Sequence, residues 1–353
     1  MLDFLIFAGY NSYISQNNFN IQKGEDFLED FYQTTVNDYK ASFRMDIKKG
    51  PNSMDFIMET PEGPCTSSIF DVLPYVHLIY YDIHAHSLPG GQEQAPAAGT
   101  PVQLNYCLEG KTELMLDDET YIYMGSNDLC LSCQSSQGDT YFPLKFYRGL
   151  AVYFDDAFFG LPNRTLMDQL LPDVNLLRKI YISAVNTFLG EANPKVKAAM
   201  ERLWKLYGNP EIFYKRLYVL ELLHCLIEEN GCQKKSYMSY TNAQVEIAKK
   251  AEKILTGDLS RHIPVRTIAQ QFGVSETSLK NYFRGVYGKN ISLYLHDLRM
   301  EAAEKVLVTT ELPISEIAAQ VGYTKQGKFA QVFKTAFGQS PLEYRRMKKL
   351  QNI

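Results

Sequence analysis

The sequence has few cysteines and no long apolar segment, and these two absences exclude several classes of protein. Six cysteines among 353 residues are too few for the disulfide scaffold of a small secreted domain. No stretch approaches about 18 consecutive apolar residues, so the sequence predicts no transmembrane helix. Residues 1–7 form a short apolar run without a preceding basic segment, which argues against a secretory signal. We therefore expect a cytoplasmic protein.

The composition also excludes wholesale disorder and fibrous structure. Apolar residues make up 45% of the chain and charged residues 22%, as in an ordinary globular protein. At roughly 100–200 residues per domain, 353 residues leave room for two or three domains. The chain is long enough to bury a substantial core.

Two of the cysteines, Cys130 and Cys133, have the C-x-x-C spacing found in zinc sites and redox motifs. A structural zinc ion takes four ligands, and the sequence has no second C-x-x-C pair and no H-x3-H pair. A thioredoxin-like pair begins a helix, whereas residues 128–133 have the pattern of a strand. We therefore interpret these cysteines as semi-buried thiols and expect no metal ion and no other cofactor.

Charge is distributed unevenly along the chain. Residues 241–353 contain 17 Lys and Arg against 10 Asp and Glu, which gives a net charge of +7. Residues 1–240 contain 19 Lys and Arg against 30 Asp and Glu, which gives a net charge of −11. This asymmetry indicates that one domain contacts a polyanion and the other does not.

The basic segment contains an internal repeat. Seven residues recur, and the spacing between the copies grows by one position after the fourth. The first four recur 49 positions later, with Pro264, Ile268, Ala269 and Gly273 matching Pro313, Ile317, Ala318 and Gly322. The last three recur 50 positions later, with Phe283, Gly288 and Tyr294 matching Phe333, Gly338 and Tyr344.

Each copy has the features of a helix-turn-helix motif. The proline begins a short helix, where its missing N–H group costs nothing. The glycine ends that helix because it adopts a positive φ without a side-chain clash. Ser275 in the first copy and Thr324 in the second are placed to cap the next helix. That helix has an inward apolar stripe at i, i+3 and i+4, made of Leu279, Tyr282 and Phe283, and then of Phe329, Val332 and Phe333.

The opposite face of each second helix carries the polar and cationic groups that contact base edges and phosphates. The candidates for base contacts are Thr277, Lys280, Asn281, Gln326 and Gln331. The candidates for phosphate contacts are Arg284, Lys289, Lys334 and Arg345. A plain helical-hairpin repeat is the competing interpretation, but such repeats continue in arrays, whereas this one stops after two copies. We therefore expect binding to double-stranded DNA.

Residues 292–308 predict one long helix between the two copies. Its apolar and acidic residues alternate at helical spacing. About 17 residues at ~1.5 Å each span roughly 25 Å. Such a helix can place the two second helices about one duplex turn, ~34 Å, apart on one face of DNA.

The segment from about Gln244 to Met347 resembles the DNA-binding domain of the AraC (arabinose-operon regulator) family. Three stretches carry the resemblance: residues 299–307 (RMEAAEKVL), residues 314–323 (ISEIAAQVGY) and residues 329–345 (FAQVFKTAFGQSPLEYR). The resemblance implies a bacterial transcription regulator with two helix-turn-helix motifs joined by a linker helix. Gly327 departs from the family pattern and weakens the second recognition helix by up to ~1 kcal/mol against alanine.

Residues from about 70 to 160 have the pattern of an antiparallel β-structure, with turn signals roughly every 8–12 positions. This spacing predicts a barrel or a sandwich. The clearest strands are residues 102–108, 112–116, 120–124, 129–132 and 150–154, with turns at Gly110 and at Asp117-Asp118. The run from Glu109 to Leu129 resembles the cupin-type effector domain that many members of the same family carry.

The sequence His84-Ala85-His86 suggests a metal site, because metal-binding cupins use an H-x-H pair. No glutamate follows at the expected short distance, and a Pro-Gly-Gly loop intervenes, so we assign no metal ligand. A polar pocket wall and a structural cluster with Asp82 both remain open. If the strands enclose an effector, the candidate wall is His84, His86, Tyr106 and Glu113, which suits a polyhydroxylated or amine-bearing ligand.

Two amphipathic helices, residues 195–206 and 212–228, precede the basic segment. They serve either as a lid on the sheet or as a dimer seam. The predicted fold class is multidomain, with an N-terminal mainly-β cupin-like barrel plus helices and a C-terminal all-α tandem helix-turn-helix domain. We assign no role to residues 1–65. We expect residues 66–165 to form the cupin-like effector domain and residues 166–229 to form a helical dimerisation or packing region. Residues 230–243 are then a linker, and residues 244–350 form the DNA-binding domain.

We expect a ligand-responsive transcription regulator and not an enzyme. Its expected partners are promoter or operator DNA, a small-molecule effector, a second copy in a homodimer and RNA polymerase, with no membrane contact. Effector binding would shift the population of arrangements of the DNA-binding domains. Two alternatives stay open: a regulator whose N-terminal domain only dimerises, and a cupin isomerase or dioxygenase fused to a DNA-binding module.

Overall fold

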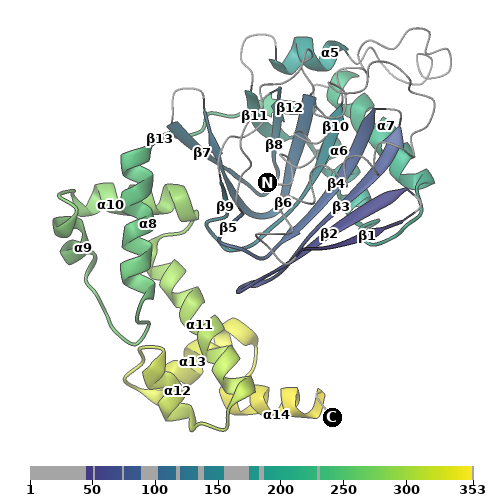
Figure 1. Ribbon diagram of the computed structural model, residues 1–353. Helices are drawn as coiled ribbons and strands as arrows, with labels where there is room; N and C mark the ends of the chain where they lie inside the picture. The colour runs from purple at the N-terminus through teal and green to yellow at the C-terminus, as the bar shows by residue number, and fades with distance from the viewer. Residues whose placement is uncertain are drawn as a thin grey trace. The chain divides into compact units, whose positions relative to one another are not determined.

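In the computed structural model the chain forms two compact units, Met1–Ser239 and Tyr240–Ile353. The N-terminal unit is rich in strands and the C-terminal unit is helical (Figure 1). The predicted order of a mainly-β region and a helical region is therefore confirmed. The structure describes residues 45–50, 52–73, 75–88, 102–116, 120–133, 139–154, 175–182, 187–228 and 231–351.

An antiparallel sheet forms the body of the N-terminal unit. Its long central strands are β3 (Gly63–Leu73), β4 (Val76–Ile83), β6 (Val102–Met115) and β10 (Tyr147–Phe154). Strand β10 pairs with β4 on one side and with β6 on the other. The other strands of this sheet are β1 (Met45–Lys49), β2 (Ser53–Thr60), β7 (Thr120–Gly125), β8 (Asp128–Ser132), β11 (Thr187–Ala192) and β12 (Cys232–Lys234). Strands β5 (Ser87–Leu88) and β9 (Thr140–Tyr141) form a separate pair.

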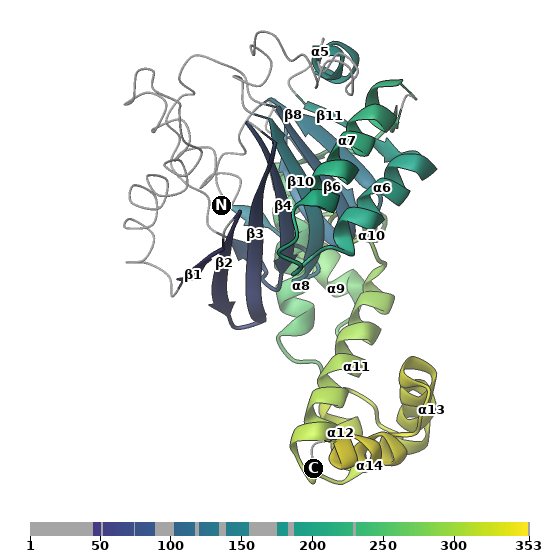
Figure 2. The ribbon, with the colours of Figure 1, turned by 90° about the vertical axis from the view of Figure 1, so that its right-hand side faces the viewer.

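Both faces of the sheet are buried. In β4, Leu78 and Tyr80 belong to one hydrophobic cluster, and Ile79 and Tyr81 belong to the other. This alternation follows from the period of two in a strand, which sends successive side chains to opposite faces. Helices α6 (Pro194–Trp204) and α7 (Phe213–Glu228) cover the first face, as Figure 2 shows.

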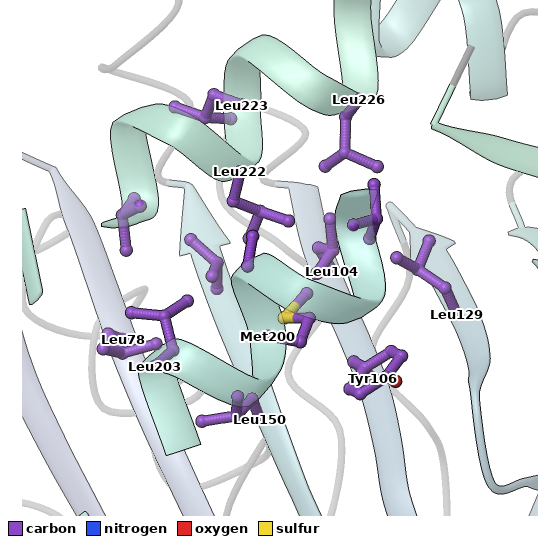
Figure 3. Packing of buried hydrophobic residues seen from close by; sticks show 14 of the residues in the cluster. Leu78, Leu104, Tyr106, Leu129, Leu150, Met200, Leu203, Leu222, Leu223 and Leu226 are labelled. Carbon is purple, nitrogen blue, oxygen red and sulfur yellow. The ribbon is translucent and has the colours of Figure 1, made fainter. Parts of the chain in front are cut away.

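Helix α6 begins where the sequence favours a start. Asn193 caps it by accepting hydrogen bonds from the backbone N–H groups of Lys195 and Val196, and a proline follows at the first helical position. Met200 of α6 and Leu222 of α7 pack in the cluster that contains the sheet residues Leu78, Leu104 and Leu150 (Figure 3). The two predicted helices therefore act as a lid on the sheet of their own chain.

The predicted barrel is not closed. Strand pairing follows the path β1-β2-β3-β4-β10-β6-β8-β11-β12, and β7 pairs with β6 beside that path. Within the described residues, the end strands β1 and β12 are not paired with each other, so the sheet is open. Turn spacing predicted the antiparallel pairing, but closure depends on strand tilt and stagger, which the spacing does not encode.

Gly110 is not a turn, contrary to the prediction. It lies inside β6 with a φ of +90° and pairs with Tyr147 of β10, two residues after Leu108, which the register between the two strands skips. A Cβ at Gly110 would lie 2.3 Å from the carbonyl oxygen of Phe146. The glycine permits the close approach of the neighbouring backbone beside this bulge, and the two strands predicted at residues 102–108 and 112–116 form the single strand β6. The predicted Asp117-Asp118 turn lies outside the described residues.

Two predicted boundaries differ from the structure. The region 166–229 is not purely helical, since β11 follows the short helix α5 (Asn175–Leu177) and a π-helical segment (Arg178–Ile182). The predicted linker 230–243 includes β12, which pairs with β11, and the first residues of the next helix. Strand β12 has only three residues and a mostly polar sequence, so the sequence pattern does not predict it. Strands β1 and β2 lie in the segment 1–65, which carried no assignment.

The C-terminal unit begins with the two-residue strand β13 (Tyr240–Thr241) and continues as helices. Helix α11 (Ile291–Thr309) confirms the long helix predicted for residues 292–308. The other helices are α8 (Asn242–Thr256), α9 (Val265–Gln271), α10 (Glu276–Tyr287), α12 (Ile314–Gln320), α13 (Gln326–Phe337) and α14 (Pro341–Gln351).

Candidate nucleic-acid interface

The first helix-turn-helix motif consists of α9 and α10. Ile268 and Ala269 of α9 are buried in its core. Gly273 has a φ of +66° in the turn, a conformation that glycine adopts without strain. Ser275 Oγ accepts a hydrogen bond from the backbone N–H of Ser278 at 3.0 Å and caps α10. The predicted turn and the predicted cap are both confirmed here.

The second motif consists of α12 and α13. Gly322 has a φ of +81° and ends α12 as predicted. The predicted cap by Thr324 is wrong, because α13 begins at Gln326 and its N-cap is Lys325, which makes no capping hydrogen bond. The second copy thus has the same turn as the first, but its recognition helix begins one position later.

The sequence repeat is also a repeat of packing. The rings of Phe283 and Tyr294 meet edge to face at 5.2 Å, and those of Phe333 and Tyr344 meet in the same way at 5.6 Å. The tyrosine hydroxyl of each copy donates to a glutamate, Tyr294 to Glu252 at 3.0 Å and Tyr344 to Glu304 at 2.9 Å. Each motif therefore has its own core with the same arrangement of aromatic rings.

The five candidates for base contacts are all exposed. They lie on α10 and α13, the second helices of the motifs: Thr277, Lys280, Asn281, Gln326 and Gln331. Lys280 Nζ lies 3.2 Å from the carboxylate of Glu276, one helical turn earlier. An exposed pair of this kind contributes only ~0.3–0.5 kcal/mol, so Lys280 can leave it at little cost. A Cβ at Gly327 would meet nothing within 4 Å, so this position is open to solvent.

The four candidates for phosphate contacts divide into two pairs. Arg284 and Lys334 are exposed in the last turns of α10 and α13, where a phosphate can approach them. Lys289 instead forms a 2.7 Å ion pair with Asp297. Burial acts to raise the pKa of Asp297, but hydrogen bonds from Lys289 and His296 outweigh it and lower that pKa.

Arg345 also has a structural role. Its Nε donates to the Leu307 carbonyl at 3.2 Å and its Nη2 donates to the Leu312 carbonyl at 2.7 Å. These bonds connect α14 to the last turn of α11 and to the loop between α11 and α12. The sequence could not reveal this, because the two acceptors are backbone groups more than 30 positions away.

Lys328 is a further candidate that the sequence analysis missed. It is exposed on α13, three positions before Gln331, and residues three apart lie on one side of a helix. The spacing to Gln331 was the signal that could have identified it.

The proposed effector wall is not assembled as predicted. Tyr106 is fully buried in the cluster between the sheet and helices α6 and α7 (Figure 3). Its hydroxyl donates to Asn127 at 3.1 Å, and burial raises its pKa above the usual range. Tyr106 is therefore a core residue and not a pocket wall. Its place in β6 did not indicate which face of the sheet it occupies.

The other three wall candidates make separate local contacts. His84 Nε2 lies 3.2 Å from Asp82, which agrees with the structural cluster considered for these residues. The ring of His86 meets that of Tyr141 edge to face at 4.6 Å. Glu113 accepts a 2.6 Å hydrogen bond from the Tyr123 hydroxyl.

No group of three or more His, Cys, Asp and Glu residues in the described part of the chain has a geometry suited to a metal ion. Cys130 lies in strand β8, as predicted, and is buried. Among the residues whose structure is described, no helix is both long enough and apolar enough to span a membrane.

Comparisons with known proteins agree with this geometry. A family model described as a helix-turn-helix domain matches residues 268–347. The arabinose operon regulatory protein of Salmonella typhimurium is 33% identical over 84 residues, which are 24% of this chain and 30% of that protein. The regulatory protein SoxS of Escherichia coli K12 is 32% identical over 87 residues, which are 25% of this chain and 81% of SoxS. The chain belongs to the AraC family.

The AraC-type match lies in the C-terminal unit, since residues 268–347 all belong to it. The transcriptional activator RhaR of Enterobacter sp. strain 638 is 32% identical over 104 residues, which are 30% of this chain and 37% of RhaR. The chain thus matches about a third of the length of RhaR and of the arabinose regulator. The C-terminal unit is an AraC-type helix-turn-helix domain.

Proposed function

We propose that this protein is a transcription regulator that binds double-stranded DNA sequence-specifically through both helix-turn-helix motifs. The observation that carries this proposal is the repeated packing, which exposes amide and cationic side chains on the second helix of each motif. Amide and cationic side chains on such a helix contact base edges in the major groove. The net charge of +7 on residues 241–353 supplies an additional attraction that is independent of sequence.

The exposed side chains suggest a division of roles. Thr277, Lys280 and Asn281 of α10 contact one block of base pairs, and Gln326 and Gln331 of α13 contact a second block. Arg284 and Lys334 contact phosphates. Lys289 and Arg345 stabilise the fold of the domain through the contacts described above.

The N-terminal unit regulates this binding in our proposal. Its net charge of −11 disfavours contact with DNA. The cupin-type resemblance of residues 109–129 supports a role in sensing a small molecule. The proposal includes a homodimer that contacts RNA polymerase in the cytoplasm. In the homodimer, the effector changes the populations of the different arrangements of the two copies' DNA-binding domains.

Selection from a pool of random duplexes with the full chain tests the proposed function. We expect an enriched sequence with two conserved blocks about one helical turn, ~10 base pairs, apart. Asn281→Ala should alter the consensus of one block only, and Gln331→Ala that of the other. An enriched pool without a shared sequence, or no retention of duplex at all, would contradict the proposal.

A further inference from the structure

Helix α11 belongs to both helix-turn-helix motifs. Near its start, Tyr294 packs against Phe283 of the first motif. In its later turns, Ala303 and Leu307 pack in one cluster with Phe329 of the second motif. Since the two cores contact different turns of one helix, bending of α11 changes their relative orientation unless a second contact opposes it.

Arg299 supplies a second contact, from the part of α11 between these turns. Its Nε donates to the Leu259 carbonyl at 3.1 Å, and its Nη2 donates to the Arg261 carbonyl at 3.1 Å. Both acceptors lie in the loop between α8 and α9, which leads directly into the first motif. Hydrogen bonds from charged donors are stronger than those between neutral groups, so the guanidinium holds this loop firmly.

The loop that accepts these bonds is itself ordered. Asp258 Oδ1 accepts hydrogen bonds from the Ser260 backbone N–H at 3.0 Å and from the Ser260 hydroxyl at 2.6 Å. These bonds lower the pKa of Asp258. The backbone N–H of Arg261 donates to the Asp258 carbonyl at 3.2 Å. Arg299 therefore binds a turn that has hydrogen bonds of its own.

The turn of the second motif contacts the same place. A Cβ at Gly322 would lie 2.6 Å from the Leu259 carbonyl oxygen and 3.1 Å from the guanidinium carbon of Arg299. Burial raises the pKa of the neighbouring Tyr323, and the positive charge of Arg299 opposes part of this rise. The loop between α8 and α9, Arg299 and the turn of the second motif thus meet at one point, which we call the Arg299 junction (Leu259, Arg261, Arg299 and Gly322).

The repeat provides an internal comparison. With the 50-residue offset that relates Tyr294 to Tyr344, Arg299 corresponds to Lys349 of α14. Lys349 Nζ pairs with Glu311 at 2.5 Å, and both side chains are exposed. The second copy therefore has a surface ion pair at the position where the first copy has the contact between motifs.

We propose that Arg299 is a positioning residue that fixes the relative orientation of the two motifs and thereby determines the spacing between the two base-pair blocks that the protein accepts. This inference rests on the proposed function, and it assigns Arg299 no contact with DNA. Without the guanidinium, α11 bends more freely, and the domain tolerates a wider range of spacings.

The test uses the full chain and the two blocks found by selection. Binding is titrated on duplexes with the preferred spacing, with one or two base pairs added or removed, and with a single block. We expect the wild-type affinity to fall about tenfold or more on altered spacing, about 1.4 kcal/mol. We call the affinity for the preferred spacing divided by the affinity for an altered spacing the spacing ratio. For Arg299→Ala the spacing ratio should fall to about two- to threefold, and the affinity for a single block should stay unchanged. Lys349→Ala, the matched control, should keep the wild-type ratio.

Several results would overturn the inference. An equal loss of affinity for single-block and two-block duplexes, or a salt dependence reduced by about one charge, would show that Arg299 supports the fold or contacts phosphate. If Arg299→Ala does not fold, Arg299→Gln is tested instead. Its shorter, uncharged amide cannot donate to both carbonyls, so an unchanged spacing ratio for that variant would contradict the role. If the wild type itself retains no duplex, the proposed function fails. If both Arg299 variants bind DNA with the spacing ratio of the wild type, only the proposed role of Arg299 is refuted and the proposed function stands.

Discussion

Arg345 and Arg346 are neighbours on α14, but the structure gives them different surroundings. Arg345 donates to two backbone carbonyls, whereas Arg346 is exposed. We expect Arg345→Ala to lower the free energy of unfolding of the C-terminal unit by ~1.5–3 kcal/mol, because two acceptors lose a charged donor. Arg346→Ala should change it by less than ~0.5 kcal/mol. Urea unfolding of both variants measures the difference, and equal stabilities would show that the carbonyl contacts contribute little.

Asn281 and Arg284 lie one turn apart on α10 and should affect DNA binding in different ways. Asn281→Ala should cost ~1–3 kcal/mol on the selected sequence and relax discrimination at one or two base pairs, because an amide pairs with a base edge. Arg284→Ala should weaken binding to all sequences similarly and reduce the salt slope by ~1, because it removes a phosphate contact. Gel-shift titrations on selected and random duplexes distinguish the two. Equal weakening of both duplexes by Asn281→Ala would mean that another face of α10 approaches the bases.

Tyr106 is a core residue with one polar contact. Tyr106→Ala should destabilise the N-terminal unit by ~3–5 kcal/mol, because it leaves a cavity beneath α6 and α7. Tyr106→Phe loses only the hydrogen bond to Asn127 and should cost ~1 kcal/mol. Thermal unfolding followed by tyrosine fluorescence compares the variants. If Tyr106→Phe left stability unchanged but abolished an effector response, Tyr106 would contact the effector after all.

At the scale of the element, the two recognition helices each contain a glycine, and we expect opposite effects from alanine at the two positions. A Cβ at Gly285 in α10 would lie 2.1 Å from the ring of Tyr240, whereas a Cβ at Gly327 in α13 meets nothing within 4 Å. Gly285→Ala should therefore destabilise the C-terminal unit by ~1–3 kcal/mol through overpacking. Gly327→Ala should stabilise it by up to ~1 kcal/mol through helix propensity.

Denaturant unfolding of these two variants checks the prediction. A gain in stability for both would show that Tyr240 moves aside without cost. A lower free energy of unfolding in both variants would show that the fold needs the space around Gly327 to stay empty.

Elements defined by local patterns were predictable from the sequence. The helix at residues 292–308 and the cap at Ser275 follow from spacing and from short-range hydrogen bonds, and both are present. The predicted turn at Gly110 and the cap at Thr324 are wrong. In the first case the bulge depends on a partner strand, and in the second the helix begins one residue later than in the other copy.

At the scale of the whole molecule, the division into a β-rich unit and a helical unit was predictable from hydrophobic periodicity and charge. The closure of the sheet and the make-up of the effector wall were not. Both depend on which strands pair and which face each side chain occupies, and these contacts join residues far apart in the chain. Tyr106 is the clearest example, since its burial depends on helices that begin about 90 residues later.

The proposed function requires that both motifs contact one duplex together. Methylation interference on the selected duplex tests it most directly, because methylation of guanine N7 blocks contacts in the major groove. We predict two clusters of interfering guanines, centred about 10 base pairs apart on one face of the DNA. A single cluster, or interference spread evenly along the duplex, would show that the two motifs do not read the major groove together.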